Sequence, residues 1–521
     1  MLILTGDTLS NEELARIAYG IEKIKLAEHA IGAIKDSHKK VVELANAGNA
    51  IYGVNTGFGI FADKRITRDE SIVLNRNLIY SHAVATGEPI PEPVVRAAMA
   101  IRINALAKGV SGIQYEIIEA LTIMLNKKAT PVVSSKGSLG SSGDLCLLAQ
   151  IGLTLIEDES ENENLTGQVQ YENQVLSGKI ALDKLGLSPI QFSYKDGLAL
   201  INGATFSAAF TALAVYEAGE LADIADIAAS LSLEALRGVS NAFHPGIHAL
   251  RNMAGQQKSA ENIRSLTDGS TLIDSSDVLQ DAYSLRCAPQ VHGCVRDTIA
   301  HACQVVTSEI NAATDNPLMV DDDTVISGGN FHGEPVGFVA DFLAIALTEL
   351  GAISERRTFR LVDKKLNNGL PAMLVGLGSS EGINSGVMIL QYTAAALVLQ
   401  NQTLATPDSI RSLPTSANQE DHNANAYNAS LHLWEILENT TKVLAIEIYC
   451  AIRALQIRRI SQPEFHLGKR TRIIFEQFST EFSYESEDMQ WRNDLEKLYQ
   501  FLTFPNVFRR KLISVVNGIK S

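Results

Sequence analysis

A glycine- and serine-rich segment, Gly137–Leu145, is the clearest place where this chain could do chemistry. It reads Gly-Ser-Leu-Gly-Ser-Ser-Gly-Asp-Leu and leads into an apolar run. Glycine lets a backbone turn tightly or approach another group closely. The segment lacks the Gly-Lys-Ser/Thr ending of a phosphate-binding P-loop and the Gly-x-Ser-x-Gly elbow of hydrolases. Taken alone, it is equally typical of a flexible turn before a helix.

Other short motifs accompany this segment in a definite order. In chain order the set is Tyr52–Gly59, Gly137–Leu145, Asn202-Gly203, Gln280–Cys287, Asp315-Asn316-Pro317, Gly328–His332 and Asn418–His422. Each motif is weak by itself, but together they resemble the histidine and aromatic amino acid ammonia-lyase family along most of the chain. The resemblance implies an all-α enzyme with a long central helical bundle of the fumarase/aspartase-like type. It also implies a mixed N-terminal region that carries the glycine- and serine-rich loop.

In that family the tripeptide before Asp-Leu cyclises into an electrophilic 4-methylidene-imidazol-5-one, called MIO. The resemblance therefore implies that Ser141, Ser142 and Gly143 form this group, with no external cofactor. The Gly143 nitrogen attacks the Ser141 carbonyl carbon in a compressed loop, and Ser142 then loses its hydroxyl as water. Such an electrophile is needed because ordinary side chains give little help in breaking an unactivated Cβ–H bond and expelling ammonia.

The resemblance also assigns roles to side chains outside this loop. Tyr52 matches the catalytic base and Tyr283 a second active-site tyrosine. A phenol has an ordinary pKa of about 10, so it is a poor base at neutral pH unless the site stabilises the phenolate, which a helix N-terminus or the Arg286 charge could do. Arg286 itself matches the clamp that holds the substrate carboxylate through two charge-assisted hydrogen bonds. The remaining expected contacts to substrate or ring are Asn202, Gln280 and Phe331.

Two positions bear on which amino acid is bound. His82 and Glu420 resemble residues that face the imidazole in histidine-specific members, and Gln419 is taken as a further substrate contact. They would line a phenyl pocket poorly, because each unpaired polar group costs roughly 1–3 kcal/mol. Conversion of L-histidine to trans-urocanate is therefore favoured. Some tyrosine-specific members also carry a Ser-His pair like Ser81-His82 of this chain. A tyrosine or phenylalanine ammonia-lyase that gives a cinnamic acid, or a 2,3-aminomutase, therefore stays open.

The chain departs from the family pattern near this loop. Ser141 replaces the alanine of the common Ala-Ser-Gly, and its hydroxyl is either neutral or a cause of impaired cyclisation or an altered pocket. Cys146-Leu147 and Gln150 replace the usual Ala-Pro and His. The segment Asn423–Tyr427 replaces Val-Ser-Met, which could reshape the pocket. A catalytically silent helical oligomer that only binds an amino acid is the alternative from another class.

Charge and composition exclude several other classes. Lys+Arg 44 against Asp+Glu 59 gives a net charge of −15, and an acidic chain repels phosphate backbones, so no nucleic acid partner is expected. A hydrophobic content of 46% is ample for a large core. The 5 cysteines are scattered and contain no CxxC pair, so they indicate neither a disulfide framework nor a thiolate metal site.

Metal, membrane and secretion signals are also missing from the pattern. His244 and His248 have ligand-like spacing, but Pro245 and Gly246 break the helix that would align them, so we expect no metal. We see no secretory signal, and the long apolar stretches are too short or carry charges for a membrane span. A cytoplasmic protein is expected.

Long helices must position these residues. Apolar residues recur at helical spacing from Leu433 to Leu455, and residues 207–237, 291–313, 335–361 and 385–403 read similarly. Such helices favour a bundle. A short hairpin is predicted over 169–171 and 174–176. We expect an N-terminal region with the Tyr52 and MIO loops (1–200), a central bundle (201–460) and a C-terminal helical region (461–521). The resemblance implies a homotetramer whose active sites draw on more than one chain.

Overall fold

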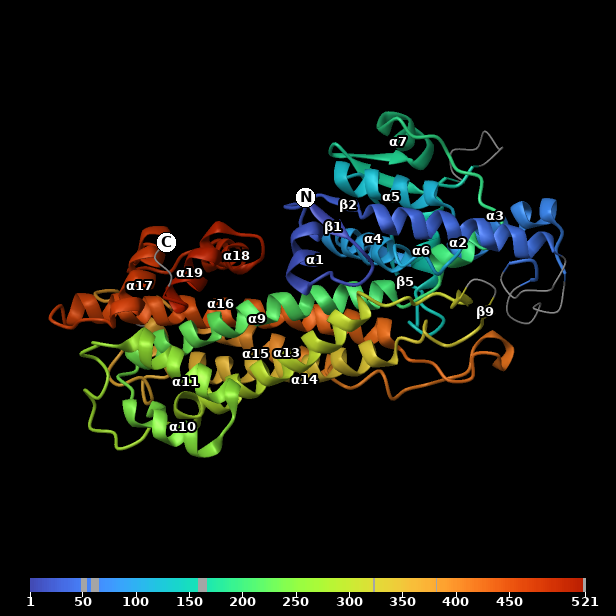
Figure 1. Cartoon of the computed structure of the whole chain (residues 1–521). Coiled ribbons are helices and arrows are strands. Elements are labelled where there is room, and N and C mark those ends of the chain that lie inside the picture. The colour runs from blue at the N-terminus through green and yellow to red at the C-terminus, as the bar shows by residue number, and fades with distance from the viewer. Residues whose placement is uncertain (48–53, 58–64, 158–165, 322–323, 381, 519–521) are drawn as a thin grey trace. The chain divides into compact units, whose positions relative to one another are not determined.

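The five long helices expected from the apolar spacing are all present in the computed structural model. They are α9 (Thr205–Ala235), α13 (Ala288–Glu309), α14 (Glu334–Val362), α15 (Met388–Leu404) and α16 (Ala426–Ser461). Helix α9 is buried on almost every side, which suits its run of alanine and leucine with few polar residues. The all-α fold expected from the sequence is confirmed, with only short strands beside the helices (Figure 1).

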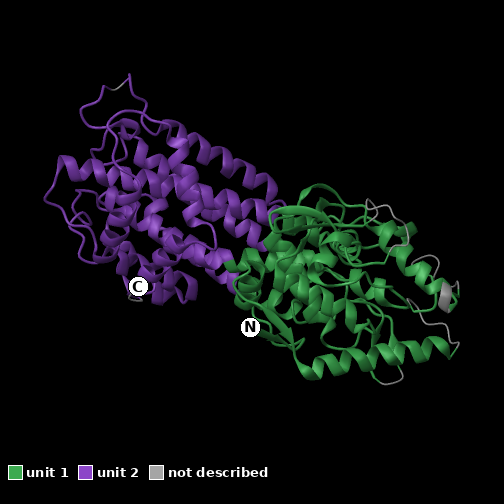
Figure 2. Cartoon of the chain, turned by 90° about the horizontal axis from the view of Figure 1, so that it is seen from above, with its two compact units in different colours: residues 1–216, 302–341, 407–431 green, residues 217–301, 342–406, 432–521 purple. Residues whose placement is uncertain are grey.

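The structure describes residues 1–521 apart from 48–53, 58–64, 158–165, 322–323, 381 and 519–521. The described chain divides into two compact units, each assembled from separate stretches of sequence (Figure 2). Unit 1 comprises residues 1–216, 302–341 and 407–431, and unit 2 comprises 217–301, 342–406 and 432–521. Helices α9, α14 and α16 begin in unit 1 and end in unit 2.

Unit 1 holds the shorter helices and the described strands. Its helices are α1 (Asn11–Ala18), α2 (Glu28–Asn46), α3 (Arg68–His82), α4 (Glu92–Leu106), α5 (Tyr115–Lys127), α6 (Leu145–Gly152), α7 (Gly178–Leu185) and α8 (Asp196–Ile201), with the 3-10 turn Ser416–Asn418. Its strands are β1 (Leu2–Leu4), β2 (Ile24–Leu26), β3 (Thr86–Pro89), β4 (Thr130–Pro131), β5 (Ser134–Lys136), β6 (Gln168–Tyr171), β7 (Gln174–Ser177), β8 (Leu318–Met319) and β9 (Val325–Ile326). Strands β1 and β2 pair in parallel; the sheets β3-β5, β4-β6-β7 and β8-β9 are antiparallel.

The predicted hairpin is confirmed as β6 and β7. Tyr171 pairs with Gln174, and the two residues between them, Glu172 and Asn173, have φ of 50° and 61°. Positive φ at both central residues is the geometry of a type I′ turn, whose twist matches that of the flanking strands. Strand β4 extends the sheet, since Thr130 pairs with Gln170.

Helix α4 lies at the centre of unit 1. Every residue from Val94 to Leu106 is buried, including two arginines. The Arg96 guanidinium donates to the carbonyls of Ala18 at 2.8 Å and Ile17 at 3.0 Å, so its burial is compensated by hydrogen bonds. The second arginine, Arg102, reaches the candidate active site.

Unit 2 contains the remaining helices. They are the 3-10 turn Ser240–Phe243, α10 (Pro245–Arg251), α11 (Ala254–Thr267), α12 (Tyr283–Arg286), the 3-10 turn Ala372–Leu374, α17 (Lys469–Glu481), α18 (Trp491–Leu502) and α19 (Val507–Val516). Phenylalanines from α17, α18 and α19 pack together, with Phe501 and Phe508 stacked 4.6 Å apart. This aromatic cluster holds the C-terminal helices of the unit together.

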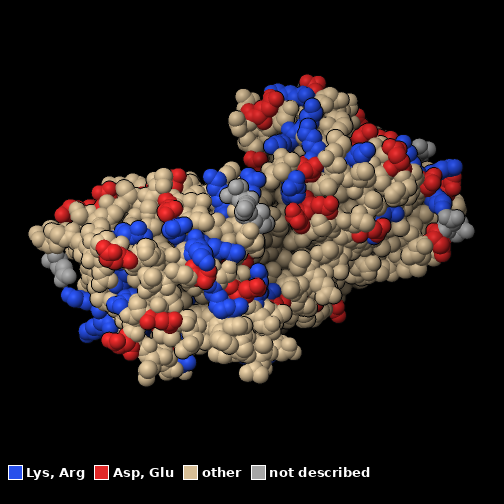
Figure 3. Space-filling view, turned by 60° about the vertical axis from the view of Figure 1, so that its left-hand side comes forward, with Lys and Arg blue, Asp and Glu red and all other residues tan. Residues whose placement is uncertain are grey.

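Helix α14 is long and apolar. Among the described residues it is a helix whose length and composition would allow it to cross a membrane, but 72% of its most apolar window is buried in the protein. Burial of this extent is typical of a core helix. On the face drawn in Figure 3, acidic and basic side chains are interspersed among uncharged areas.

Candidate active site

The loop between β5 and α6 contains the predicted MIO tripeptide and is shaped by glycine. Gly140 and Gly143 have φ of +64° and +95°, in the left-handed region that favours glycine. A Cβ atom on Gly143 would lie 2.1 Å from the Gly203 nitrogen, and one on Gly140 would lie 2.9 Å from the Tyr427 nitrogen. Neither position has room for a side chain, so the tight backbone approach predicted for this loop is present.

Gly203 forms the opposite wall of this tight approach. It follows α8 and has φ of +115°. The Asp144 N–H donates to its carbonyl at 2.9 Å, and its own N–H donates to the Ser142 carbonyl at 3.4 Å. Arg102 supports the same turn by donating to the Asn202 carbonyl and, at 2.6 Å, to Thr314 Oγ1. The tripeptide backbone is therefore packed closely against a buried, hydrogen-bonded turn.

Asp144 ties the end of the loop to the start of α9. Its carboxylate is fully buried and accepts hydrogen bonds from Ser138 Oγ at 2.7 Å and from the Ser207 N–H at 2.8 Å. Burial raises the pKa of Asp144 to about 6, although these hydrogen bonds act in the opposite direction. The sequence placed Asp144 in the motif without a role; its partner Ser207 is distant in sequence and carried no signal.

Asn202 contributes a polar atom that lacks a partner. Its Nδ2 lies 3.5 Å from the Asn316 carbonyl, and its Oδ1 is buried with no hydrogen-bond partner among the described residues. A buried amide oxygen of this kind costs free energy unless a further group donates to it. Because Asn202 directly precedes Gly203, the unsatisfied atom lies in the same turn that presses on the tripeptide.

Glu420 lies against the tripeptide. Ser142 Oγ donates to Glu420 Oε1, and Thr415 Oγ1 donates to Oε2 at 2.9 Å. The Thr415 N–H also donates to the Glu420 carbonyl at 2.8 Å, so both backbone and side chain are held. The structure thus brings together Ser142 and Glu420, two predicted site residues that are far apart in the sequence.

His82, at the end of α3, lies within the electrostatic reach of Glu420. Burial lowers the pKa of His82, and the Glu420 charge opposes part of this effect. Its Nδ1 is 3.0 Å from Ser81 Oγ. A neutral imidazole ring next to a carboxylate can both donate and accept, which suits a polar ring as partner.

For Phe331 and Gln419, the structure gives backbone hydrogen bonds of their segments. The Gly333 N–H donates to the Gly140 carbonyl at 3.0 Å, which joins the segment of Phe331 to the loop, and Phe331 itself is half-buried. Gln419 is exposed, and its backbone N–H donates to the Ser416 carbonyl at 3.0 Å. Tyr52, the predicted base, lies outside the described residues.

The other predicted site residues, Gln280, Tyr283 and Arg286, belong to unit 2. Tyr283 and Arg286 begin and end the single turn α12, and the Arg286 guanidinium carbon lies 4.6 Å from the centroid of the Tyr283 ring. The Tyr283 side chain is 71% exposed. Arg286 Nε is buried without a hydrogen-bond partner among the described residues, so this guanidinium retains a donor for a ligand.

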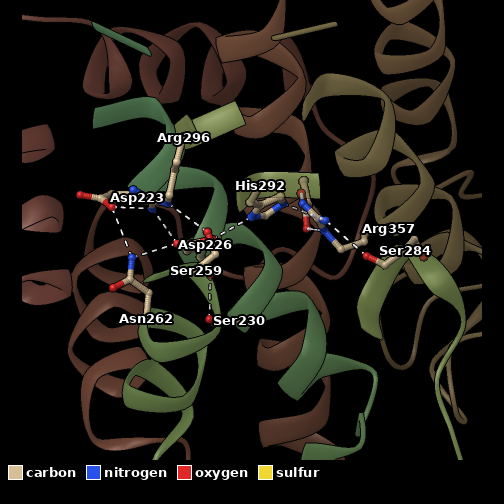
Figure 4. Close-up of polar contacts among 10 residues, drawn as sticks. Asp223, Asp226, Ser230, Ser259, Asn262, Ser284, His292, Arg296 and Arg357 are labelled. Carbon is tan, nitrogen blue, oxygen red and sulfur yellow. Dashed lines mark hydrogen bonds and ion pairs between the residues drawn. The ribbon is translucent and has the colours of Figure 1, made fainter. Parts of the chain in front are cut away.

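A buried charged network in unit 2 holds this turn (Figure 4). Arg357 on α14 donates to the Ser284 carbonyl of α12 at 3.3 Å. It also forms a bidentate pair with Glu447 on α16, at 2.6 and 2.8 Å, and both side chains are fully buried. Paired in this way, the two charges are compensated, and the guanidinium is fixed where it meets the α12 backbone.

The network continues through His292 to a cluster of aspartates. His292 Nε2 is 3.4 Å from Arg357 Nη1, and its Nδ1 is 2.7 Å from Asp226 Oδ1. Because a guanidinium only donates, Nε2 must accept and Nδ1 must carry the proton. Burial lowers the pKa of His292, with Asp226 opposing, so the neutral ring is favoured. Arg296 bridges Asp226 and Asp223 at 2.7 and 2.6 Å.

A metal site needs several His, Cys, Asp or Glu side chains grouped around one position. Within the described residues, no group of three or more His, Cys, Asp and Glu side chains could hold a metal ion. His248, one of the spaced pair, has both ring nitrogens engaged, with the Ala242 carbonyl at 3.0 Å and Gln256 Nε2 at 2.8 Å.

The tight glycine turn and the facing carboxylate agree with what sequence comparison finds. A sequence model of the aromatic amino acid lyase family matches residues 9–480. A histidine ammonia-lyase of Caldanaerobacter subterraneus subsp. tengcongensis is 45% identical over 477 residues, 91% of each chain. The chain therefore belongs to the aromatic amino acid lyase family, and it is a carbon–nitrogen lyase.

Solved structures show the same fold. A histidine ammonia-lyase from Trypanosoma cruzi superposes with a TM-score of 0.87 at 33% identity, covering 100% of this chain and 96% of the other. A tyrosine aminomutase from Streptomyces globisporus superposes with a TM-score of 0.90 at 31% identity, covering 100% and 99%. The fold is thus shared by enzymes named for different substrates and reactions, so substrate choice must come from side chains.

Proposed function

We propose that this enzyme converts L-histidine to trans-urocanate and ammonia, using an MIO group formed from Ser141, Ser142 and Gly143. The observation that carries the proposal is the Glu420 carboxylate in contact with Ser142. A carboxylate at that place would accept a hydrogen bond from a substrate imidazole N–H while the amino acid lies against the electrophile. The curated relatives of high identity, which are named histidine ammonia-lyases, support the same substrate.

The residues around the Ser141–Gly143 tripeptide suit formation of the MIO group. Cyclisation needs the Gly143 nitrogen close to the Ser141 carbonyl carbon, and the contact with Gly203 favours that compression. The unsatisfied Asn202 Oδ1 offers a hydrogen-bond acceptor beside it. When formed, MIO supplies an electrophile that draws electrons from the substrate. Enzymes generally stabilise transition states by about 8–23 kcal/mol, and an electron sink is the largest contributor available here.

The other site residues bind and orient the substrate and remove its Cβ proton. In this proposal Arg286 holds the substrate carboxylate through its free Nε donor and its second nitrogen. Tyr52 takes the Cβ proton, and Tyr283 acts as the second active-site tyrosine. Asn202 and Gln280 hydrogen-bond the substrate or ring, and Phe331 supplies an apolar wall. His82, Glu420 and Gln419 set the preference for imidazole.

A substrate assay tests this reading directly. The purified protein is offered L-histidine, L-tyrosine and L-phenylalanine separately, and the unsaturated acids are followed by ultraviolet absorbance. Release of urocanate from histidine, with little cinnamic acid from the others, is the expected result. Turnover of tyrosine but not histidine would refute the role given to Glu420. Formation of a β-amino acid, detected by chromatography of the same mixtures, would instead identify an aminomutase.

We further propose that the active enzyme is a cytoplasmic homotetramer with shared active sites. In unit 2, large apolar side chains are exposed along α14 and α15: Phe342 at 47%, Ile345 at 48%, Ile389 at 62%, Tyr392 at 63% and Leu399 at 64%. Contiguous exposed apolar side chains typically mark an interface. Tyr283, predicted to act in catalysis yet 71% exposed, also suits a site completed by another chain.

Mixing two inactive variants tests the shared site. Ser142→Ala removes the MIO precursor, and Arg286→Ala removes the carboxylate clamp. If one site combines these residues from different subunits, co-expression restores part of the activity, because some mixed tetramers contain an intact pair. No recovery in mixed tetramers, verified by mass and light scattering, would contradict sharing. Each variant expressed alone is the control.

A further inference from the structure

Two departures from the family pattern meet in the structure. Ser141, which stands where relatives commonly carry alanine, is 6% exposed. Its Oγ accepts a hydrogen bond from the Ala424 N–H at 3.0 Å and donates to the Leu139 carbonyl at 3.4 Å. Ala424 lies in the segment Asn423–Tyr427, which is the second departure. The extra hydroxyl thus links the MIO loop to a second unusual segment.

The contact belongs to a series that runs along both segments in opposite directions. Gly140 lies against Tyr427, since a Cβ on Gly140 would be 2.9 Å from the Tyr427 nitrogen. Ser141 follows with Ala424, and Ser142 follows with Glu420. The Ser141 hydroxyl is the middle contact of this series, and it is the one polar side chain supplied by a departure from the common Ala-Ser-Gly.

Hydrogen bonds of neighbouring residues connect Ala424 to the Glu420 side chain. Asn423, adjacent to Ala424, donates from Nδ2 to the Leu413 carbonyl and, at 3.3 Å, to Thr415 Oγ1. Thr415 Oγ1 in turn donates to Glu420 Oε2 at 2.9 Å. A shift of the backbone at Ala424 would therefore displace the Glu420 carboxylate through the hydrogen bonds of Asn423 and Thr415.

An alanine at position 141 would leave this arrangement with a missing acceptor. Ala424 is fully buried, so its N–H would lose its partner in a place that water does not readily reach. A buried donor without a partner costs free energy, and the segment would relax to recover it. Cyclisation uses the backbone carbonyl of residue 141 and leaves its side chain intact, so the hydroxyl is still present beside the finished ring.

We propose that the Ser141 hydroxyl is a positioning group that holds residues 415–424 so that Glu420 faces the substrate imidazole. The inference rests on the proposed histidine activity and adds a specificity-determining residue to it. Its effect falls on recognition of the ring, and formation of the MIO group does not need the hydroxyl.

Full-length Ser141→Ala and Ser141→Thr variants test this role, with Ser308→Ala as control. Ser308 is an exposed helix residue whose hydroxyl donates to the Gln304 carbonyl of its own helix. Intact mass should show the loss of two waters in all of these proteins. Amide hydrogen exchange in the peptide containing Ala424 should be faster in Ser141→Ala, and close to the wild-type rate in Ser141→Thr, which keeps a hydroxyl.

Kinetics then separate recognition from folding. In Ser141→Ala the KM for histidine and the inhibition constant of urocanate should rise roughly three- to tenfold, the equivalent of one lost hydrogen bond. The inhibition constant of cinnamate, which has no imidazole, should stay unchanged, and kcat should change less than KM. Ser141→Thr should restore the wild-type constants.

Distinct outcomes overturn the proposal. An uncyclised Ser141→Ala chain would place the hydroxyl in MIO formation, and equal changes for urocanate and cinnamate would make its role merely structural. Unchanged exchange and unchanged constants would give it no role. Failure of wild-type protein to release urocanate from histidine would contradict the proposed function instead, while mass and exchange would still report on the Ser141–Ala424 contact.

Discussion

The MIO loop of unit 1 and the α12 turn of unit 2 are both held rigidly, but by different physical means. The loop is fixed by backbone contacts between glycines, where a Cβ on Gly143 would come within 2.1 Å of Gly203. The α12 turn is fixed by a buried ion pair, in which Arg357 meets Glu447 and reaches the Ser284 carbonyl. The loop needs glycine positions that leave no room for a Cβ, in addition to the hydrogen bonds of Asp144 and Arg102, whereas the α12 turn is held by the Arg357 side chain.

This difference matches the roles that we propose for the two regions. A condensation between backbone atoms needs those atoms pressed together, which only neighbouring glycine backbone allows. A turn that presents Arg286 must instead be oriented without being covalently changed, and a forked guanidinium on a carbonyl does this well. We therefore expect substitutions in the loop to abolish activity and substitutions around the α12 turn to reduce stability or substrate binding by graded amounts.

The largest effect is expected for Ser142→Ala. Without the Ser142 hydroxyl no methylidene can form, so turnover of histidine should fall by several orders of magnitude while the helical content and assembly are kept. Activity is measured by urocanate absorbance, and folding by circular dichroism and light scattering. Substantial turnover in a variant confirmed by mass would refute the MIO mechanism.

Arg357→Met should destabilise unit 2 strongly. It leaves Glu447 buried without its partner, a situation that costs about 3–5 kcal/mol, read as a lower midpoint in urea unfolding. Arg357→Lys keeps the charge but cannot form the fork and also reach Ser284, so it should mainly raise KM. Arg492→Met, at a pair that is 87% exposed on the arginine side, is the control and should cost less than about 1 kcal/mol. A neutral Arg357→Met would contradict the anchoring role.

Glu420→Gln should act on histidine more than on cinnamate binding. An amide replaces the anionic acceptor, and charged hydrogen bonds contribute about 1.5–3 kcal/mol, so kcat/KM for histidine should fall by about 10- to 100-fold. The inhibition constant of cinnamate, which cannot use this acceptor, serves as the internal control. Equal losses for both ligands would show that Glu420 supports the loop and does not recognise the ring.

The smallest expected effect concerns pH and Asp144. Burial raises its folded-state pKa from 3.8 to about 6, so folding favours the protonated form. Its contribution to stability is therefore complete below about pH 4 and is lost as pH rises through about 6; between pH 5 and pH 7 the loss is about 1 kcal/mol. Asp144→Asn should remove this pH dependence. Difference urea curves at pH 5 and pH 7 measure it, and a parallel pH dependence in the variant would contradict the assignment.

Helices and motifs could be predicted from the sequence because their signals are local. Apolar spacing indicated α9, α13, α14, α15 and α16, and two short segments separated by Glu172-Asn173 indicated the β6–β7 hairpin. The fold class, the family and the lyase chemistry followed from motifs in order. The division into three regions and the roles of the site residues stay predictions.

The contacts that position the site could not be predicted in this way. Ser141 bonds Ala424, Arg357 bonds Ser284, and Asp144 bonds Ser207, each pair joined only by the tertiary fold. No spacing rule relates such residues. Tyr427 shows the same limit: the sequence places it in a segment that could reshape the pocket but does not give its contacts, in which its hydroxyl donates to the Ser135 carbonyl at 3.0 Å and its ring lies 6.0 Å from Phe210.

The intact mass of the purified wild-type chain shows whether the MIO group has formed. Condensation of the Gly143 nitrogen with the Ser141 carbonyl and dehydration of Ser142 each remove one water. The mass should therefore be lower than that of the sequence by two waters, with the whole deficit in the peptide that spans residues 141–143. A mass equal to that of the unmodified sequence would refute MIO formation and with it the proposed reaction.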